Sequence, residues 1–315
     1  MTLEVMLTDR RVIESSLDML QQEAPWAVFH AASSEEEALA LADRIHVLCG
    51  WPGEKLLEAS RNLKWLHVGA AGVNQLPLAE LSRRGIITTN AQGMHGDTIA
   101  DHVMALILAW SRKLPLRLQR QREGLWDRGG DARELAGTTL GVIGLGGIGR
   151  KVAGRARAFG MTVIGTRRSG GDVPEADAVY HADQMLEMLP RCEFVAVCCP
   201  LTAQTEGLLG REALRTLPRG AFIVNIARGK VIDEEELIAA LREEHLGGAG
   251  LDVFAVEPLP EDSPLWTLEN VMVTPHVAGE QSRGGEKVAR RLIENLKRWH
   301  REEPLMWVVD YEAGY

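Results

Sequence analysis

The feature that most constrains the fold of this chain is a glycine-rich turn within residues 140–169. The apolar run at 140–143 predicts a short buried strand, a helical apolar stripe follows the turn, and residues 161–165 predict the next strand. The turn has the spacing G-x-G-x-x-G, formed by Gly144, Gly146 and Gly149 with Gly147 and Ile148 between them. Between a strand and a helix, this spacing lets the backbone approach a pyrophosphate at the helix N-terminus. The sequence therefore predicts a dinucleotide-binding βαβ unit.

The residues at the end of the second strand bear on the choice of dinucleotide. A site for NAD usually places Asp or Glu here, to accept hydrogen bonds from the ribose 2′-hydroxyl. This chain instead has Thr166, Arg167, Arg168 and Ser169, with no carboxylate among them. Guanidinium and hydroxyl groups suit a 2′-phosphate, through charge-assisted hydrogen bonds. The pattern favours NADP(H) over NAD(H), and the alternative interpretation is a solvated arginine pair on a loop.

Composition and charge exclude several classes of protein. The chain has 315 residues, 45% of them apolar and 25% charged, which is typical of a globular protein. Its formal net charge of −9 argues against general nucleic-acid binding. The N-terminus lacks the regions of a signal peptide and the apolar run at 103–110 is too short to span a bilayer, so we expect a cytoplasmic location and no membrane partner. The four cysteines have no metal-ligand spacing, so we expect reduced thiols and no metal site.

Strand and helix patterns alternate on both sides of the glycine turn, which predicts an α/β protein with parallel sheets and two domains. We expect residues 100–281 to form a Rossmann-type, doubly wound dinucleotide-binding domain. Residues 1–99, joined by the C-terminal segment 282–315, should form a flavodoxin-like parallel α/β domain that binds substrate. Within the dinucleotide-binding domain, the polar and basic stretch 115–133 is interpreted as an arm or loop that carries Trp126.

Three polar side chains follow predicted parallel strands: Arg228, Glu257 and His276. Ligands of open α/β sheets bind at the carboxyl ends of the strands. A histidine can move a proton near neutral pH, a carboxylate can orient its ring, and an arginine offers a planar fork to an anion. The three residues therefore predict a site that binds an anion and moves a proton.

The segments around these residues resemble signatures of the D-isomer-specific 2-hydroxyacid dehydrogenases. They read N-x-x-R-G at 225–229, D-V-F-x-x-E-P at 252–258 and T-P-H-x-x-G at 274–279. Weaker matches at 100–102 and 199–202 extend the resemblance over nearly the full length, although Asp101 stands where the family usually has Glu. The resemblance implies a glyoxylate/hydroxypyruvate reductase-like enzyme. It would transfer a hydride between NADP(H), with NAD(H) as the alternative, and a small 2-keto or 2-hydroxy acid in a cleft between two domains. Reduction of a 2-keto acid needs a proton donor for the carbonyl oxygen and a partner for the carboxylate. In such an enzyme His276 would supply the proton, Glu257 would orient its ring, and Arg228 would bind the carboxylate and polarise the carbonyl.

The resemblance also implies roles for residues outside these signatures. Backbone amides near Ala71 and Gly72 would hold the substrate carboxylate, and the arm around Trp126 would reach the second subunit of a homodimer. Asp252 would lie near the nicotinamide, or only fix its loop. The remaining residues placed in the cofactor site are Thr98, Pro200, Thr205, Ile226, Ala227 and Gly279. Trp51, Leu76 and Met94 are candidates for the substrate pocket and are equally consistent with core positions.

Two other functions remain open. Some relatives of this family are dinucleotide-sensing corepressors, and a related dehydrogenase could act on another small anion such as phosphite. The acidic chain and the complete set of Arg228, Glu257 and His276 favour an enzyme. Formate dehydrogenases carry Gln in place of Glu257, which argues against that activity.

Overall fold

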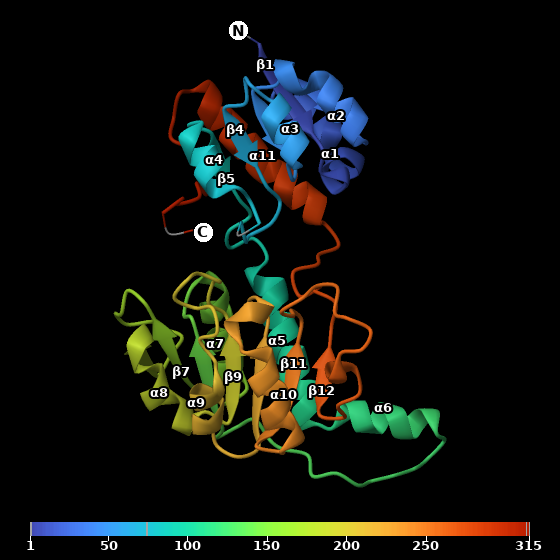
Figure 1. Cartoon of the computed structure of the whole chain (residues 1–315), viewed down its shortest axis with the longest axis vertical. Helices are drawn as coiled ribbons and strands as arrows, with labels where there is room; N and C mark the ends of the chain where they lie inside the picture. The colour runs from blue at the N-terminus through green and yellow to red at the C-terminus, as the bar shows by residue number, and fades with distance from the viewer. Residues whose placement is uncertain (1, 74, 313, 315) are drawn as a thin grey trace. The chain divides into compact units, whose positions relative to one another are not determined.

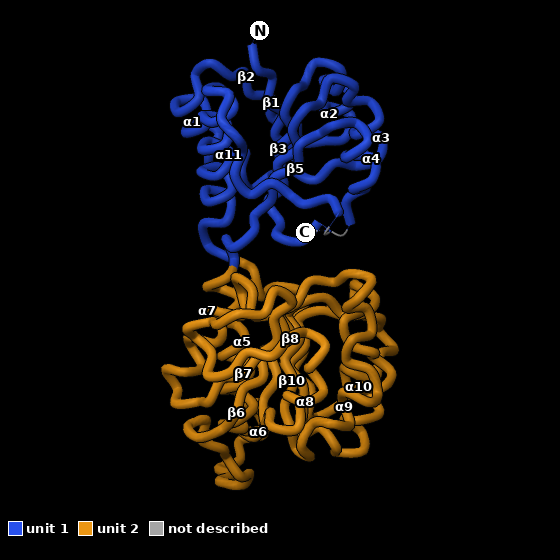
Figure 2. The backbone as a smooth tube through the Cα atoms, turned by 90° about the vertical axis from the view of Figure 1, so that its left-hand side faces the viewer, with its two compact units in different colours: residues 1–95, 281–315 blue, residues 96–280 orange. Residues whose placement is uncertain are grey.

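The computed structural model describes residues 2–73, 75–312 and 314. The chain forms two compact units, shown in Figure 2. Unit 1 comprises residues 1–95 and 281–315, and unit 2 comprises residues 96–280. Unit 1 therefore contains both ends of the chain, which passes between the units twice, at 95/96 and at 280/281.

Unit 1 has a five-stranded sheet of order β2-β1-β3-β4-β5, in which neighbouring strands pair in parallel (Figure 1). The strands are β1 (Leu3–Leu7), β2 (Ala27–Ala31), β3 (Val47–Cys49), β4 (Trp65–His67) and β5 (Ile87–Thr89). The helices are α1 (Arg10–Glu23), α2 (Glu35–Leu41), α3 (Glu54–Ala59), α4 (Leu78–Arg83) and α11 (Gly284–His300). This is the flavodoxin-like order.

Helix α11 brings the C-terminal segment back into unit 1, where it packs against α1. Its apolar residues Val288, Leu292 and Leu296 recur about one turn apart and are at most 1% exposed. Each buried side chain of this kind contributes about 1.5–3 kcal/mol. Trp299 at the end of the helix stacks on Trp65 of β4, with ring centroids 5.9 Å apart. Apolar burial therefore joins the two ends of the sequence in one core.

Unit 2 has a seven-stranded sheet of order β12-β11-β10-β9-β6-β7-β8, again with parallel neighbours. The strands are β6 (Thr139–Ile143), β7 (Thr162–Arg167), β8 (Ala178–His181), β9 (Phe194–Val197), β10 (Ala221–Asn225), β11 (Leu246–Leu251) and β12 (Val271–Val273). The helices are α5 (Gly96–Ser111), α6 (Leu114–Arg122), α7 (Gly147–Ala158), α8 (Met185–Met188), α9 (Arg211–Thr216) and α10 (Glu234–Arg242). Counted from β6, this is the doubly wound Rossmann order, which confirms the predicted fold class.

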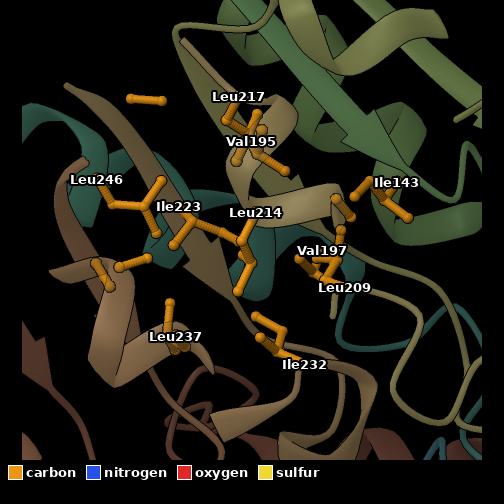
Figure 3. Packing of buried hydrophobic residues seen from close by; sticks show 14 of the residues in the cluster. Ile143, Val195, Val197, Leu209, Leu214, Leu217, Ile223, Ile232, Leu237 and Leu246 are labelled. Atoms are coloured by element: carbon orange, nitrogen blue, oxygen red, sulfur yellow. The ribbon is translucent and has the colours of Figure 1, made fainter. Parts of the chain in front are cut away.

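The central strands of unit 2 are covered by α9 and α10. Figure 3 shows Leu214 of α9 and Leu217, which follows the helix, against Val195 and Ile223 of the sheet, within one buried cluster. Strands β9 and β10 are buried along their whole length, as their continuous apolar runs predict. The sheet is thus a rigid platform whose strand ends can hold a site.

In the stretch 115–133, which was predicted to be an arm or loop, the structure adds a helix that the sequence did not predict, α6 (Leu114–Arg122). Arg120 pairs with Glu123 at 2.8 Å and with Asp127 at 3.4 Å, which supports the end of this helix. Trp126 beyond the helix is 95% exposed. Strand β8 was also not predicted. None of the helices in the described part of the chain combines the length and apolar character that crossing a bilayer requires.

Candidate functional site

The glycine turn between β6 and α7 is held tightly against its surroundings. Gly144 has a φ of 98°, in the left-handed region that favours glycine, and a Cβ atom there would lie 2.8 Å from the backbone nitrogen of Cys199. The Gly144 N–H donates to the Thr166 hydroxyl at 3.2 Å, and Leu145 N–H donates to the Thr166 carbonyl at 2.8 Å. Thr166 is only 4% exposed, so its side chain acts on the candidate site by fixing the turn.

Helix α7 presents its N-terminus at this turn. Gly146 is the N-cap residue, and within the described residues no side chain caps the helix. The N–H groups of the first turn, including those of Gly147 and Ile148, concentrate the partial positive charge of the helix end. A Cβ atom at position 146 or 147 would meet nothing within 4 Å. These residues therefore fit the pyrophosphate of a dinucleotide.

Basic side chains lie at the end of β7. Arg167 is half-buried, Arg168 is exposed, and the β7–β8 register places His181 beside Arg167. Nδ1 of His181 lies 2.7 Å from the Asp183 carboxylate, which raises the pKa of His181. Sequence reasoning missed His181 because the only signal for it was strand β8.

Asn225 shapes the turn that carries Arg228. Asn225 is 1% exposed; its side-chain amide donates to the Arg228 carbonyl at 3.1 Å and accepts from the Ala227 N–H at 3.0 Å. The Arg228 guanidinium donates to the Ala227 carbonyl at 2.6 Å. Burial lowers the pKa of Arg228, while the Glu257 carboxylate opposes that shift. The guanidinium remains protonated and can bind an anion.

Glu257 and His276 form the polar pair that the sequence predicted as a unit. Nδ1 of His276 lies 2.7 Å from Oε2 of Glu257. The other oxygen, Oε1, accepts from the Phe254 N–H at 3.0 Å, so the carboxylate is fixed on both sides. The His276 side chain is 47% exposed, which leaves its ring accessible to a substrate.

Asp252 anchors the loop that carries His276. Its carboxylate is 2% exposed and accepts from the Thr274 hydroxyl at 2.6 Å and from the N–H groups of Val277 and Ala278, both at 2.9 Å. The Asp252 carbonyl accepts from the His276 N–H at 2.8 Å. These contacts fit the interpretation in which Asp252 fixes the loop.

In unit 1, the small-residue turn after β4 is held from one side. The carbonyls of residues 69, 70 and 71 accept, respectively, from Nε2 of His95 at 3.4 Å, the Ala91 N–H at 2.9 Å and the Asn90 side-chain amide at 2.7 Å. Asn90 is 2% exposed, so this amide is a buried brace. Ala71 and Gly72 are half-buried, and their amides stay candidates for binding an anion.

The other predicted cofactor residues lie in unit 2. Thr98 is half-buried in the first turn of α5, and Gly279 is half-buried after His276. Thr205 donates its hydroxyl to the Pro200 carbonyl at 2.6 Å, which closes the loop after β9. Ile226 and Ala227 are 7% and 8% exposed in the turn after β10.

The three candidates for the substrate pocket have different surroundings in the structure. Leu76 is 6% exposed and belongs to the core of unit 1, and Met94 packs against a second core cluster. Trp51 is 42% exposed and lines a cavity of about 440 Å³ with Thr8 and Ser33. Leu76 is therefore a core residue, which was one of the two roles considered for it.

The family model for the NAD-binding domain of D-isomer specific 2-hydroxyacid dehydrogenases matches residues 104–278. The chain is 35% identical over 306 residues to a D-3-phosphoglycerate dehydrogenase of Methanocaldococcus jannaschii; the match covers 95% of this chain but 58% of that relative. It is 31% identical over 299 residues to a glyoxylate/hydroxypyruvate reductase of Arabidopsis thaliana, with 94% and 90% covered.

A solved structure is similar to both units. It is a D-isomer specific 2-hydroxyacid dehydrogenase of Xanthobacter autotrophicus in complex with NADPH and MES, 31% identical, with a TM-score of 0.85 over 100% of this chain and 99% of that one. The glycine turn fits the dinucleotide that such proteins use. The chain belongs to the D-isomer specific 2-hydroxyacid dehydrogenase family and is an oxidoreductase that acts on CH–OH groups with a nicotinamide dinucleotide.

Proposed function

We propose that this protein reduces a small 2-keto acid to the D-2-hydroxy acid, prefers NADPH, and uses His276 as its general acid. The observation that carries this proposal is the 2.7 Å contact between Nδ1 of His276 and the Glu257 carboxylate. With Nδ1 held, Nε2 is the ring nitrogen left to move a proton. The Glu257 carboxylate fixes the orientation of the ring through this contact.

Arg228 supplies the second part of the chemistry. Its planar guanidinium pairs with the substrate carboxylate and stabilises the negative charge that develops on the carbonyl oxygen. In unit 1, the backbone amides of Ala71 and Gly72 are the groups that we propose to bind a carboxylate, and in unit 2 the glycine turn is the part that we propose to bind the cofactor. The bound dinucleotide supplies the hydride.

The cofactor preference rests on the end of β7. Arg167 and Arg168 offer two guanidinium groups, and residues 166–169 include no carboxylate to receive a ribose 2′-hydroxyl. The solved relative from Xanthobacter autotrophicus contains NADPH. Preference for NADH would require an acceptor from elsewhere in the chain.

The test is the oxidation of NADPH and of NADH by the purified protein with glyoxylate, hydroxypyruvate, pyruvate and branched 2-keto acids. Turnover with NADPH preferred supports the whole proposal, and the substrate series ranks the side chains. Turnover with NADH preferred overturns the cofactor preference alone. Tight cofactor binding without turnover of any 2-keto acid contradicts the reductase and supports the sensor function; phosphite with NADP⁺ tests the other dehydrogenase.

We also propose a homodimer formed through the arm, residues 115–133. The arm has five basic and three acidic residues in a chain of net charge −9, and it exposes Leu118, Leu125 and Trp126. A basic, apolar surface on an acidic chain suits a second copy. Light scattering should give twice the 34.6 kDa mass, and the double variant Leu118→Ser and Trp126→Ser should give the monomer.

We further propose a cytoplasmic location for the protein. The four free cysteines support this proposal.

A further inference from the structure

We propose that His102 and Thr274 are positioning residues that hold His276 in its working geometry through Asp252. The inference rests on the proposed function, in which His276 moves the proton. It concerns a hydrogen-bonded chain of three side chains, His102, Thr274 and Asp252, which we call the relay.

The relay joins helix α5 to the loop after β12. Nε2 of His102 lies 3.1 Å from the Thr274 hydroxyl, and that hydroxyl lies 2.6 Å from Oδ1 of Asp252. His102 and Asp252 are 3.8 Å apart, beyond hydrogen-bond distance, so Thr274 is the link between them. The side chains of His102 and Asp252 are 20% and 2% exposed, so the relay is largely shielded from water.

The direction of each hydrogen bond follows from the groups present. An ionised carboxylate only accepts, so the Thr274 hydroxyl donates its proton to Asp252. The hydroxyl oxygen is then the acceptor for His102, whose Nε2 must carry the proton. Each group in the relay therefore has one role, and removing the hydroxyl breaks both bonds.

The relay ends on the backbone that carries His276. Asp252 accepts from the N–H groups of Val277 and Ala278, and its carbonyl accepts from the His276 N–H. His276 has a φ of 57°, a left-handed conformation that costs energy for a residue with a Cβ atom. The surrounding hydrogen bonds must impose this conformation. A loose Asp252 would let the loop relax and turn the imidazole away from its productive orientation.

Helix α5, which carries His102, is held in place by ion pairs to α7. On another face, Asp97 pairs with Lys151 of α7 at 2.6 Å, and Asp101 pairs with Arg155 at 2.6 Å. The same helix therefore contacts the helix of the glycine turn and, through His102, the catalytic loop. This arrangement explains why a histidine 172 residues distant in sequence bears on Thr274.

The experiment compares Thr274→Val, which removes the hydroxyl, with Thr274→Ser, which keeps it. We expect Thr274→Val to lower kcat about ten- to hundredfold, because a small displacement of a reacting group has such an effect. The KM for the 2-keto acid and the melting temperature should change little. Thr274→Ser should stay close to wild type. His102→Leu should lose about three- to tenfold, and His102→Gln, which retains a donor, should recover most of it.

A purely structural role for Thr274 gives different results. Wild-type kcat in Thr274→Val, or equal losses in Thr274→Val and Thr274→Ser, would overturn the inference. A second readout needs no turnover: the ¹⁵N signals of His276 in the full-length protein, assigned with His276→Asn. They should move in Thr274→Val and stay in place in Thr274→Ser. If the wild type reduces no 2-keto acid, the proposed function fails while this readout still decides the positioning role; unmoved signals contradict it.

Discussion

Gly229 lies against the backbone of Phe254 so closely that a Cβ atom at position 229 would overlap the Phe254 carbonyl. This approach brings the turn of Arg228 next to the segment that ends in Glu257. Phe254 also donates its N–H to Glu257 at 3.0 Å, so one residue serves both turns. The positions of Arg228 and Glu257 therefore depend on Gly229, a residue without a side chain.

Gly229→Ala should therefore impair function and stability together. The obstacle is backbone, which cannot turn aside as a side chain can, so the two turns must separate. We expect a loss of more than about a hundredfold in kcat/KM and of about 1–3 kcal/mol in the free energy of unfolding. Gly154→Ala on the exposed side of α7 is the matched control, where a Cβ atom meets only Glu175 at 3.9 Å. That variant should keep full activity and gain about 0.5–1 kcal/mol.

Arg167→Asp should shift the cofactor preference toward NADH. The substitution replaces a partner of the 2′-phosphate with an acceptor for the 2′-hydroxyl. The ratio of kcat/KM for NADPH to that for NADH should fall about ten- to hundredfold. Arg219→Asp, on an exposed turn of the same unit, makes the same change in net charge and should leave the ratio unchanged. An unaltered ratio in Arg167→Asp would remove the basis for the NADPH preference.

Asn90→Ala tests the brace beneath the turn of Ala71 and Gly72. The substitution leaves the carbonyl of half-buried Ala71 without its side-chain donor, so the turn should loosen. The KM for the 2-keto acid should rise about tenfold, while the KM for NADPH stays the same. Asn62→Ala removes a comparable side-chain bond to the Asp43 carbonyl on the exposed surface of unit 1 and serves as the control. A rise in both KM values would indicate general damage instead.

His67 makes the stability of the protein depend on pH. Burial lowers the pKa of His67 from 6.5 to about 4, and its Nδ1 lies 2.8 Å from the Thr89 hydroxyl. The unfolded chain therefore binds a proton at higher pH than the folded chain does. The free energy of unfolding should fall as pH decreases from about 6.5 to about 4, by up to about 3 kcal/mol, and His67 should add no further change below that range. Urea titrations should show a shallower decline for His67→Asn; an identical slope would contradict this origin.

The sequence predicted those strands and helices whose hydrophobic pattern matches their burial in the folded protein. The run at 140–143 is apolar because β6 is buried on both faces, and Gly144, Gly146 and Gly149 mark the turn that follows. Strand β8 was not predicted because it is a partly exposed edge strand without alternation. Helix α6 was missed because it buries none of its residues, which leaves no apolar stripe to recognise.

The candidate site likewise contains residues that the sequence predicted and residues that it did not. Arg228, Glu257 and His276 were predicted because each stands in a recognisable segment after a strand. Asn225 stands in one of these segments, but its role was not predicted, and Asn90 stands in none of them. Both side chains hold a backbone carbonyl, and the sequence does not reveal such a contact. His102 acts on Thr274, 172 residues away, and such a partner is visible only in the folded chain.

The most direct test of the account is the rate of hydride transfer from NADPH to hydroxypyruvate in a single turnover, measured for the wild type and for His276→Ala. If His276 donates the proton, the wild type reacts and the variant is slower by about 10²–10⁴-fold, with NADPH affinity unchanged. A variant that reacts at the wild-type rate, or a wild type that does not react with hydroxypyruvate or any other 2-keto acid, would contradict the account.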